Sequence, residues 1–164
     1  MAGRLQFISE LADWTVREVT SDAEGWKRYL NTASRLYKYS FEDQLLIYAQ
    51  RPGATACASM EIWNNKMHRW VKGGSKSIAL LRRNENRGNY LEYVFDVADT
   101  RPVRGARMPY LWEMREEHHA PVLSVLEERY GEAKGEGMGS RLMEIAAHAV
   151  EEVCKERFRD LADD

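Results

Sequence analysis

A basic segment, residues 51–87, contains the side chains best suited by type and spacing to do chemistry in this 164-residue chain. It carries eight basic and two acidic residues, and its cations are interleaved with the rings of Trp63, His68 and Trp70. Cations that neutralise phosphates, together with flat rings that stack on bases, are what binding a nucleic-acid single strand requires. The alternative is the solvated charged face of an ordinary element. The cations are Arg51, Lys66, Arg69, Lys72, Lys76, Arg82, Arg83 and Arg87.

The contacts themselves are expected around the dipeptide Gly73-Gly74. Glycine has no Cβ and takes positive φ, so backbone amides at this turn can approach a phosphate closely. Trp63, Trp70 and Tyr39 are flanked by polar or charged residues, and we expect Trp70 or Trp63 to supply the ring that stacks on bases. The predicted contacts to the phosphate backbone come from Arg69, Lys72, Lys76, Arg82 and Arg83.

The charge of the chain is unevenly distributed. Residues 51–87 stand at +6, whereas residues 113–164 carry 7 basic and 14 acidic side chains and stand at −7. The overall net charge of −2 therefore hides a basic block beside an acidic one. This division also supports an alternative function, a protein-interaction module whose basic patch docks an acidic partner or the chain's own acidic end.

No motif for catalysis or for a cofactor reaches its required pattern. Gly73–Lys76 lacks the spacing of a Walker phosphate loop, and Gly135–Gly139 does not follow a strand. Glu144, His148 and Cys154 show no metal-ligand spacing, and no serine lies in a G-x-S-x-G sequence. The sequence therefore predicts a non-enzymatic protein with no metal and no cofactor.

Cysteine usage and hydropathy indicate the compartment. Cys57 and Cys154 are far apart, and a chain of this length can form a core without a disulfide, which fits a reducing cytoplasm. The longest apolar run, Leu45–Ala49, is too short to span a bilayer, and the N-terminus lacks the apolar stretch of a signal peptide. We therefore expect a cytoplasmic protein with no membrane partner.

The elements that position these residues are helices, then short strands, then helices again. Ser21–Glu24 and Ser40–Asp43 predict capping boxes that open helices over 22–37 and 41–50, and Pro52 ends the second. Alternating apolar and polar residues predict a strand over 90–97. The remaining expected elements are a short helix at 60–65, extended pieces at 69–72 and 77–81, an irregular crossing at 98–112, and helices at 121–130 and 141–161.

The predicted fold class is α+β, with N-terminal helices packed on a small antiparallel sheet and a helical C-terminal extension. We expect residues 1–112 to form one domain and residues 113–164 to form an acidic helical extension. Several spaced blocks of the first domain resemble the N-terminal domain of ArdC-like antirestriction proteins, in the versions found within large multidomain proteins of bacterial conjugative elements. The blocks lie between about residues 26 and 99 and include Tyr37–Pro52, Arg69–Lys72, Ile78–Leu80 and Tyr93–Val97, with the sequences YKYSFEDQLLIYAQRP, RWVK, IAL and YVFDV.

This resemblance implies binding of single-stranded DNA, the form in which a conjugating element enters a cell, and a place within a longer polypeptide. Three positions depart from the family pattern: Asp43 stands where many relatives carry Asn, one cation of the lysine loop is displaced to Lys72, and Ser77 stands where that loop has glycine. The better-known ArdC proteins also carry a zinc-protease-like domain with an H-E-x-x-H motif. That motif does not occur here, so the resemblance implies no protease activity.

Overall fold

The computed structural model describes residues 2–84, 88–111 and 113–160, and the chain divides into two compact units. The first unit, Met1–Trp112, combines helices with strands, and the second, Glu113–Asp164, is helical. The helices are segregated from two small antiparallel sheets, which confirms the predicted α+β class. The division between the units lies between the basic and the acidic parts of the sequence.

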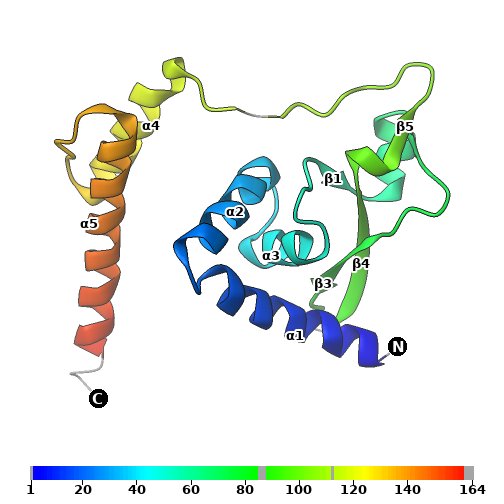
Figure 1. The fold of residues 1–164 in the computed structure, drawn as a ribbon, viewed down its shortest axis with the longest axis horizontal. Helices are drawn as coiled ribbons and strands as arrows, with labels where there is room; N and C mark the ends of the chain where they lie inside the picture. The colour runs from blue at the N-terminus through cyan, green and yellow to red at the C-terminus, as the bar shows by residue number, and fades with distance from the viewer. Residues whose placement is uncertain (1, 85–87, 112, 161–164) are drawn as a thin grey trace. The chain divides into compact units, whose positions relative to one another are not determined.

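Two helices open the first unit (Figure 1). Helix α1 (Ala2–Val19) was not predicted by any motif of the sequence. Helix α2 (Ala23–Ala33) is capped by Asp22, whose Oδ1 accepts a hydrogen bond of 2.7 Å from the Gly25 backbone N–H. The predicted cap, Ser21, is therefore one residue early, and its hydroxyl instead donates to a carbonyl at the end of α1.

The third helix, α3 (Phe41–Gln50), matches its predicted bounds. Its N-cap is Ser40 as expected, and the Asp43 backbone N–H donates to the Ser40 hydroxyl at 3.2 Å. The helix predicted over 22–37 is shorter, because α2 ends at Ala33 and a 3-10 turn, η1 (Ser34–Leu36), follows it. The tighter turn changes the angular spacing of side chains, so Tyr37 leaves the buried stripe and is 52% exposed.

The strands form two separate antiparallel sheets. The three-stranded sheet has the order β1-β4-β3, and β2 pairs with β5 in a two-stranded ribbon. The extended piece that begins at Arg69 thus pairs with residues 100–102, a part of the expected irregular crossing, and not with the next strand along the chain. The strands are β1 (Cys57–Ala58), β2 (Arg69–Val71), β3 (Ile78–Arg82), β4 (Tyr90–Asp96) and β5 (Thr100–Pro102).

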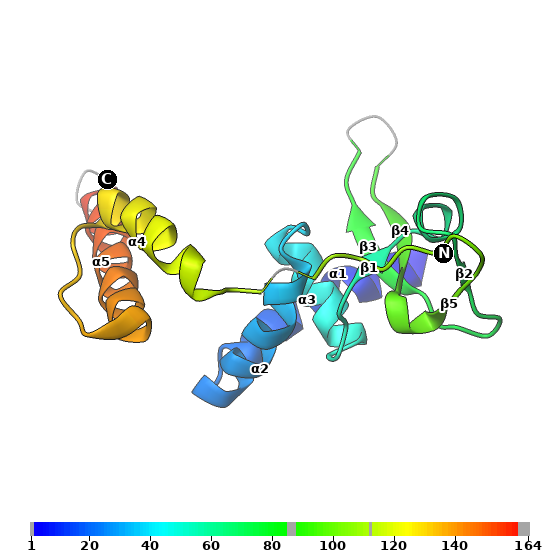
Figure 2. The ribbon, with the colours of Figure 1, turned by 90° about the horizontal axis from the view of Figure 1, so that it is seen from above.

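The core of the first unit lies between the helices and β3. Helices α2 and α3 lie on one side of the β3–β4 pair and the β2–β5 ribbon lies on the other, as both views show (Figures 1 and 2). The Gln50 side chain accepts from the Ala79 backbone N–H and donates to its carbonyl, each at 2.9 Å, and so satisfies a peptide of β3. The buried side chains include Ile8, Leu36, Leu46, Ile47, Ile78, Leu80 and Val94.

The second unit is a pair of helices, α4 (Glu116–Tyr130) and α5 (Gly137–Asp160). Helix α4 begins five residues before the predicted start at Pro121, so this proline lies inside the helix and leaves the Glu117 carbonyl without its usual intrahelical N–H donor. Leu123, Ala133 and Ile145 form its small core. No helix within the described ranges is both long enough and apolar enough to cross a bilayer.

Candidate nucleic-acid interface

The exposed face of the β2–β5 ribbon presents a ring beside a cation. Trp70 and Arg101 are directly opposite in the antiparallel register, so their side chains point to the same face. Trp70 is 53% exposed, and Arg101 is exposed as well. The strands place the expected stacking ring next to a guanidinium that the sequence analysis did not single out.

The turn after β2 holds the two lysines predicted to bind phosphate. Its backbone is fixed by hydrogen bonds from the Lys72 N–H to the Asp99 carbonyl at 2.9 Å and from the Ser75 N–H to the Lys72 carbonyl at 3.2 Å. Gly74 has a φ of +82°, and no atom lies within 4 Å of where a Cβ would stand at Gly73 or Gly74. The peptides of this turn are therefore open to a ligand from outside.

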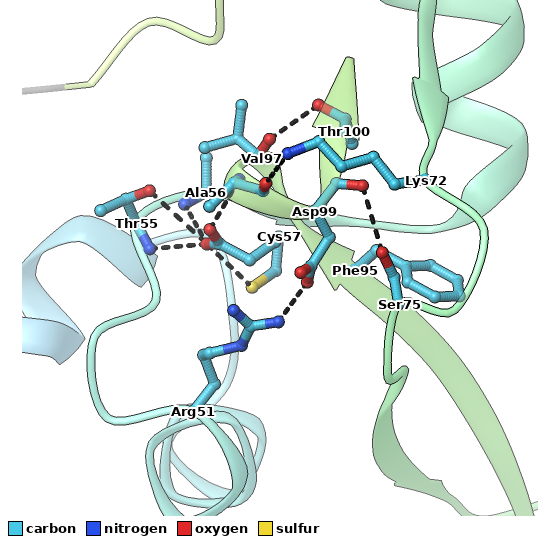
Figure 3. A network of polar contacts seen from close by, with 12 residues as sticks. Arg51, Thr55, Ala56, Cys57, Lys72, Ser75, Phe95, Val97, Asp99 and Thr100 are labelled. Atoms are coloured by element: carbon cyan, nitrogen blue, oxygen red, sulfur yellow. Dashed lines mark hydrogen bonds and ion pairs between the residues drawn. The ribbon is translucent and has the colours of Figure 1, made fainter.

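The two lysine side chains of the turn are both exposed. The Lys72 ammonium donates to the Ala98 carbonyl at 2.8 Å, which leaves its charge without a carboxylate partner in the described part of the chain (Figure 3). For Lys76, no ion pair with any described residue is present. Both cations thus keep their positive charge available on the surface.

A polar network beneath the turn holds it in place (Figure 3). The buried Asp96 carboxylate accepts from the backbone N–H groups of Thr55 and Ala56 at 2.7 and 3.1 Å and from that of Ala98 at 2.9 Å. Asp99 pairs with Arg51, and the hydrogen bond to Asp99 is the main cause that raises the pKa of this guanidinium. Arg51 therefore supports the fold of the 3-10 turn η3 (Val97–Asp99). The turn that carries Lys72 and Lys76 is hydrogen-bonded to η3 through the Asp99 carbonyl.

Two predicted contact residues are buried, and the structure corrects both predictions. Trp63 is 2% exposed, and its indole N–H donates to the Phe95 carbonyl at 2.8 Å, so its ring belongs to the core and is not an exposed stacking surface. Arg69 is 8% exposed, and its Nε donates to the Thr100 hydroxyl at 2.8 Å. Both side chains stabilise the interior: Trp63 from a π-helical turn, η2 (Ile62–Lys66), and Arg69 from the inner face of the ribbon.

Arg82 and Arg83, at the end of β3, differ in how available their charges are to a phosphate. Arg82 is half-buried and forms ion pairs with Asp43 at 2.7 Å and with Glu92 at 2.6 Å. Burial lowers the pKa of Arg82, but the hydrogen bonds to both carboxylates outweigh it and the pKa is raised. Its charge is thus already compensated, which argues against the phosphate contact predicted for it. Arg83 is exposed, 3.4 Å from the Glu42 carboxylate, and Arg87 lies outside the described residues.

A cavity of about 610 Å³ in the first unit was missed by the sequence analysis. Three segments distant in sequence enclose it, residues 35–39, 56–59 and 107–111, together with parts of η2, β3 and β4. Rings and cations line it, and the signal that could have pointed to Arg107 is a run of three arginines without an acidic residue in 100–111. These lining residues are Arg35, Tyr37, Lys38, Arg107 and Tyr110.

The inner wall of the cavity is unreactive. The Tyr39 hydroxyl donates to the Cys57 carbonyl at 2.8 Å, and burial raises the pKa of this phenol. Burial and then the charge of Asp96 raise the pKa of the Cys57 thiol to about 12, so the thiolate that a nucleophile requires is scarce at neutral pH. The cavity is therefore suited to binding and offers no activated nucleophile at this position.

No three His, Cys, Asp or Glu side chains of the described ranges gather as metal ligands would. No protein-family model, no curated protein and no solved structure matches this chain.

Proposed function

We propose that this chain is a non-enzymatic module that binds single-stranded DNA through the β2–β5 ribbon and the lysine turn, Lys72–Lys76. The observation that carries the proposal is the exposed pair of Trp70 and Arg101 on the ribbon, next in sequence to two uncompensated lysines. A ring stacks on any base, and cations with open backbone amides bind the phosphates that follow it. Trp70 supports the proposal because of the cations and open backbone amides beside it, since exposure of a single ring is common on protein surfaces.

The charge distribution supports the same function. Residues 1–112 carry 17 basic and 12 acidic side chains, a net charge of +5, and no acidic residue occurs between Glu61 and Glu85. A local excess of positive charge attracts a polyanion even when the whole chain is nearly neutral. The resemblance to the ArdC-like N-terminal domain supports a role in a mobile-element protein of the bacterial cytoplasm, where single-stranded DNA is the incoming substrate.

The test is a titration of the full chain with a fluorescent single-stranded oligo-dT and with a duplex of the same length. We expect binding of the single strand at about 50 mM salt, and an affinity that falls as salt rises with a log-log slope of about −0.7 per phosphate neutralised. Preference for the duplex, or no binding of the single strand at low salt, would overturn the proposal.

A second candidate function, docking of an acidic protein partner, is favoured by exposed apolar side chains close to the basic ones. Met108 and Tyr110 are each 72% exposed and Leu111 is 43% exposed, which is typical of protein-binding surfaces. Tryptophan fluorescence separates the two functions, because base stacking quenches the Trp70 indole and an acidic peptide does not. A Trp70→Phe variant identifies the part of the signal that comes from this ring.

A further inference from the structure

We propose that the cavity bounded by residues 35–39, 56–59 and 107–111 receives one unstacked base of the DNA strand, and that the free carboxylate oxygen of Glu92 selects bases with an exocyclic amine. The inference rests on the proposed function and adds a base preference to it. It concerns a different surface from the ribbon, so the two can be tested separately.

The size and walls of the cavity suit a nucleobase. Its volume of about 610 Å³ falls within the range of small-molecule sites, roughly 300–1,000 Å³, and exceeds what one base fills. Leu36, Trp63 and Val94 line it with buried apolar surface, and Tyr39 and Tyr110 add rings. Unstacked bases in single strands are held in this way, between aromatic and apolar side chains.

Cations near the opening supply partners for the phosphates on either side of that base. Arg35, Lys38 and Arg107 belong to the lining, and Lys38 and Arg107 are exposed. Lys38 also lies over the ring of Tyr37, with its Nζ 5.7 Å from the ring centroid. The segment that carries Arg107 is fixed by a 2.9 Å hydrogen bond from its backbone N–H to the Met67 carbonyl, so this cation keeps its place at the cavity.

Glu92 provides the selective group. One of its oxygens accepts from Arg82 Nε at 2.6 Å, and Arg82 is held from its other side by Asp43 at 2.7 Å, so the carboxylate has a fixed position. The second oxygen of Glu92 has no hydrogen-bond partner among the described residues. An ionised carboxylate accepts hydrogen bonds only, so it matches the amines of guanine, adenine and cytosine and opposes the carbonyl oxygens of thymine.

Guanine fits this group best, because its N1–H and N2 amine lie side by side and the free oxygen of Glu92 can accept a hydrogen bond from each. The decisive comparison is therefore between guanine and hypoxanthine, which has the same shape and lacks only the amine. The probes are dT12 oligonucleotides with one central dG, dI or dT, titrated into the full chain by fluorescence anisotropy. We expect the dG probe to bind about tenfold more tightly than the dI and dT probes.

Two variants and a control assign the preference to the cavity. Glu92→Gln introduces an amide that donates as well as accepts, so the dG preference is expected to disappear while binding of dT12 persists. Tyr110→Ala removes an exposed ring from the cavity wall and is expected to weaken the same preference. Glu61→Gln removes an exposed negative charge that does not line the cavity, and it should keep the preference intact. Circular-dichroism melting of each variant confirms its fold.

The free mononucleotides dGMP and dTMP, added to 15N-labelled full chain, separate this inference from the proposed function. Amide shifts at lining residues such as Cys57 and Tyr110 with dGMP support the cavity site even when no oligonucleotide binds, a result that would overturn the proposed function alone. Equal affinity for all three probes, or a preference that Glu92→Gln leaves unchanged, would overturn the inference. If an acidic peptide shifts these amides and neither dGMP nor dTMP does, the cavity binds a protein partner, and that result would also overturn the inference.

Discussion

Trp63 and Trp70 are seven residues apart in sequence and lie in opposite environments, which makes them a matched pair for mutation. Trp70→Ala is expected to weaken single-stranded DNA binding by about 1–3 kcal/mol, because it removes a stacking surface and leaves the core intact. Trp63→Ala is expected to destabilise the fold by about 3–5 kcal/mol, because the ring is 2% exposed and its N–H is hydrogen-bonded. Melting temperature and affinity are measured on the same samples.

Trp70→Tyr serves as the control for this pair, since it retains a ring at the same position and should recover part of the affinity. A Trp70→Ala protein with unchanged affinity would remove the ribbon from the binding surface. A large drop in its melting temperature would instead assign the ring a role in the fold.

Cys57 and Cys154 are expected to differ in reactivity. The thiolate is the reactive form, and the pKa of Cys57 is raised to about 12 by burial and by Asp96, whereas Cys154 is exposed. Iodoacetamide at pH 8 should therefore modify Cys154 first in the native protein and both thiols in urea, as peptide mass spectrometry can measure. Equal labelling of the two native thiols would contradict this burial.

The raised pKa of Cys57 also has a consequence for stability. The unfolded thiol, with an ordinary pKa of 9.0, loses its proton before the folded one does. Stability from this group is therefore fully present below pH 9 and falls as the pH rises from about 9 toward 12. Denaturant melts of the wild type and of Cys57→Ala across this range should show a smaller pH dependence in the variant, which keeps only the contributions of other groups with a raised pKa, such as Tyr29 and Tyr39.

At the scale of the element, the lysine turn is expected to act through charge and not through base identity. Replacing Lys72 and Lys76 together by Ala should weaken binding to every single-stranded sequence and reduce the salt slope by up to about 1.4, which corresponds to two phosphates. The fold should be unaffected, because both side chains are exposed and the backbone hydrogen bonds of the turn remain. Titrations at several salt concentrations measure the slope.

The matched control for the turn is the double variant Lys27→Ala and Arg28→Ala, which removes the same charge from the exposed surface of α2. A larger effect at the turn supports direct phosphate contacts. Equal effects of the two double variants would mean that only the net charge of the unit matters, and would remove the turn from the contact surface.

At the scale of the whole molecule, the division into two compact units predicts that each folds without the other. A chain of residues 1–112 is expected to melt cooperatively and to bind single-stranded DNA at least as tightly as the full chain, because 7 basic and 14 acidic residues have been removed with residues 113–164. Circular dichroism and the oligo-dT titration test both expectations.

A chain of residues 113–164 provides the complementary control and should be helical without binding DNA, since its net charge is −7. If residues 1–112 alone were unfolded, the first unit would depend on contacts from the second. Weaker binding by a folded 1–112 chain would place part of the DNA surface in residues 113–164.

The sequence by itself determined the features that depend on neighbours along the chain. The cap at Ser40, the end of α3 before Pro52 and the presence of a strand at Tyr90–Asp96 are local, because each follows from hydrogen bonding or residue preference within a few residues. The predicted alternation of burial in this strand is wrong, because Val94, Phe95 and Asp96 are all buried and Tyr93 is exposed. The α+β class followed from the order of such segments. The predicted cap of α2 was wrong by one residue, because Ser21 and Asp22 are both residue types that cap helices well. In the structure Asp22 caps α2, and the Ser21 hydroxyl donates to the Glu18 carbonyl of α1.

Only the tertiary structure decided which of the candidate residues are available to a ligand. Trp63 and Trp70 both have polar neighbours in the sequence, and the π-helical turn that buries one ring has no local signature. The pairing of β2 with β5 placed Arg101 beside Trp70 and turned Arg69 inward. The cavity joins segments up to about 75 residues apart and the Arg82–Asp43 pair joins β3 to α3, and contacts between such distant segments are set by the packing of the whole unit, which sequence periodicity does not encode.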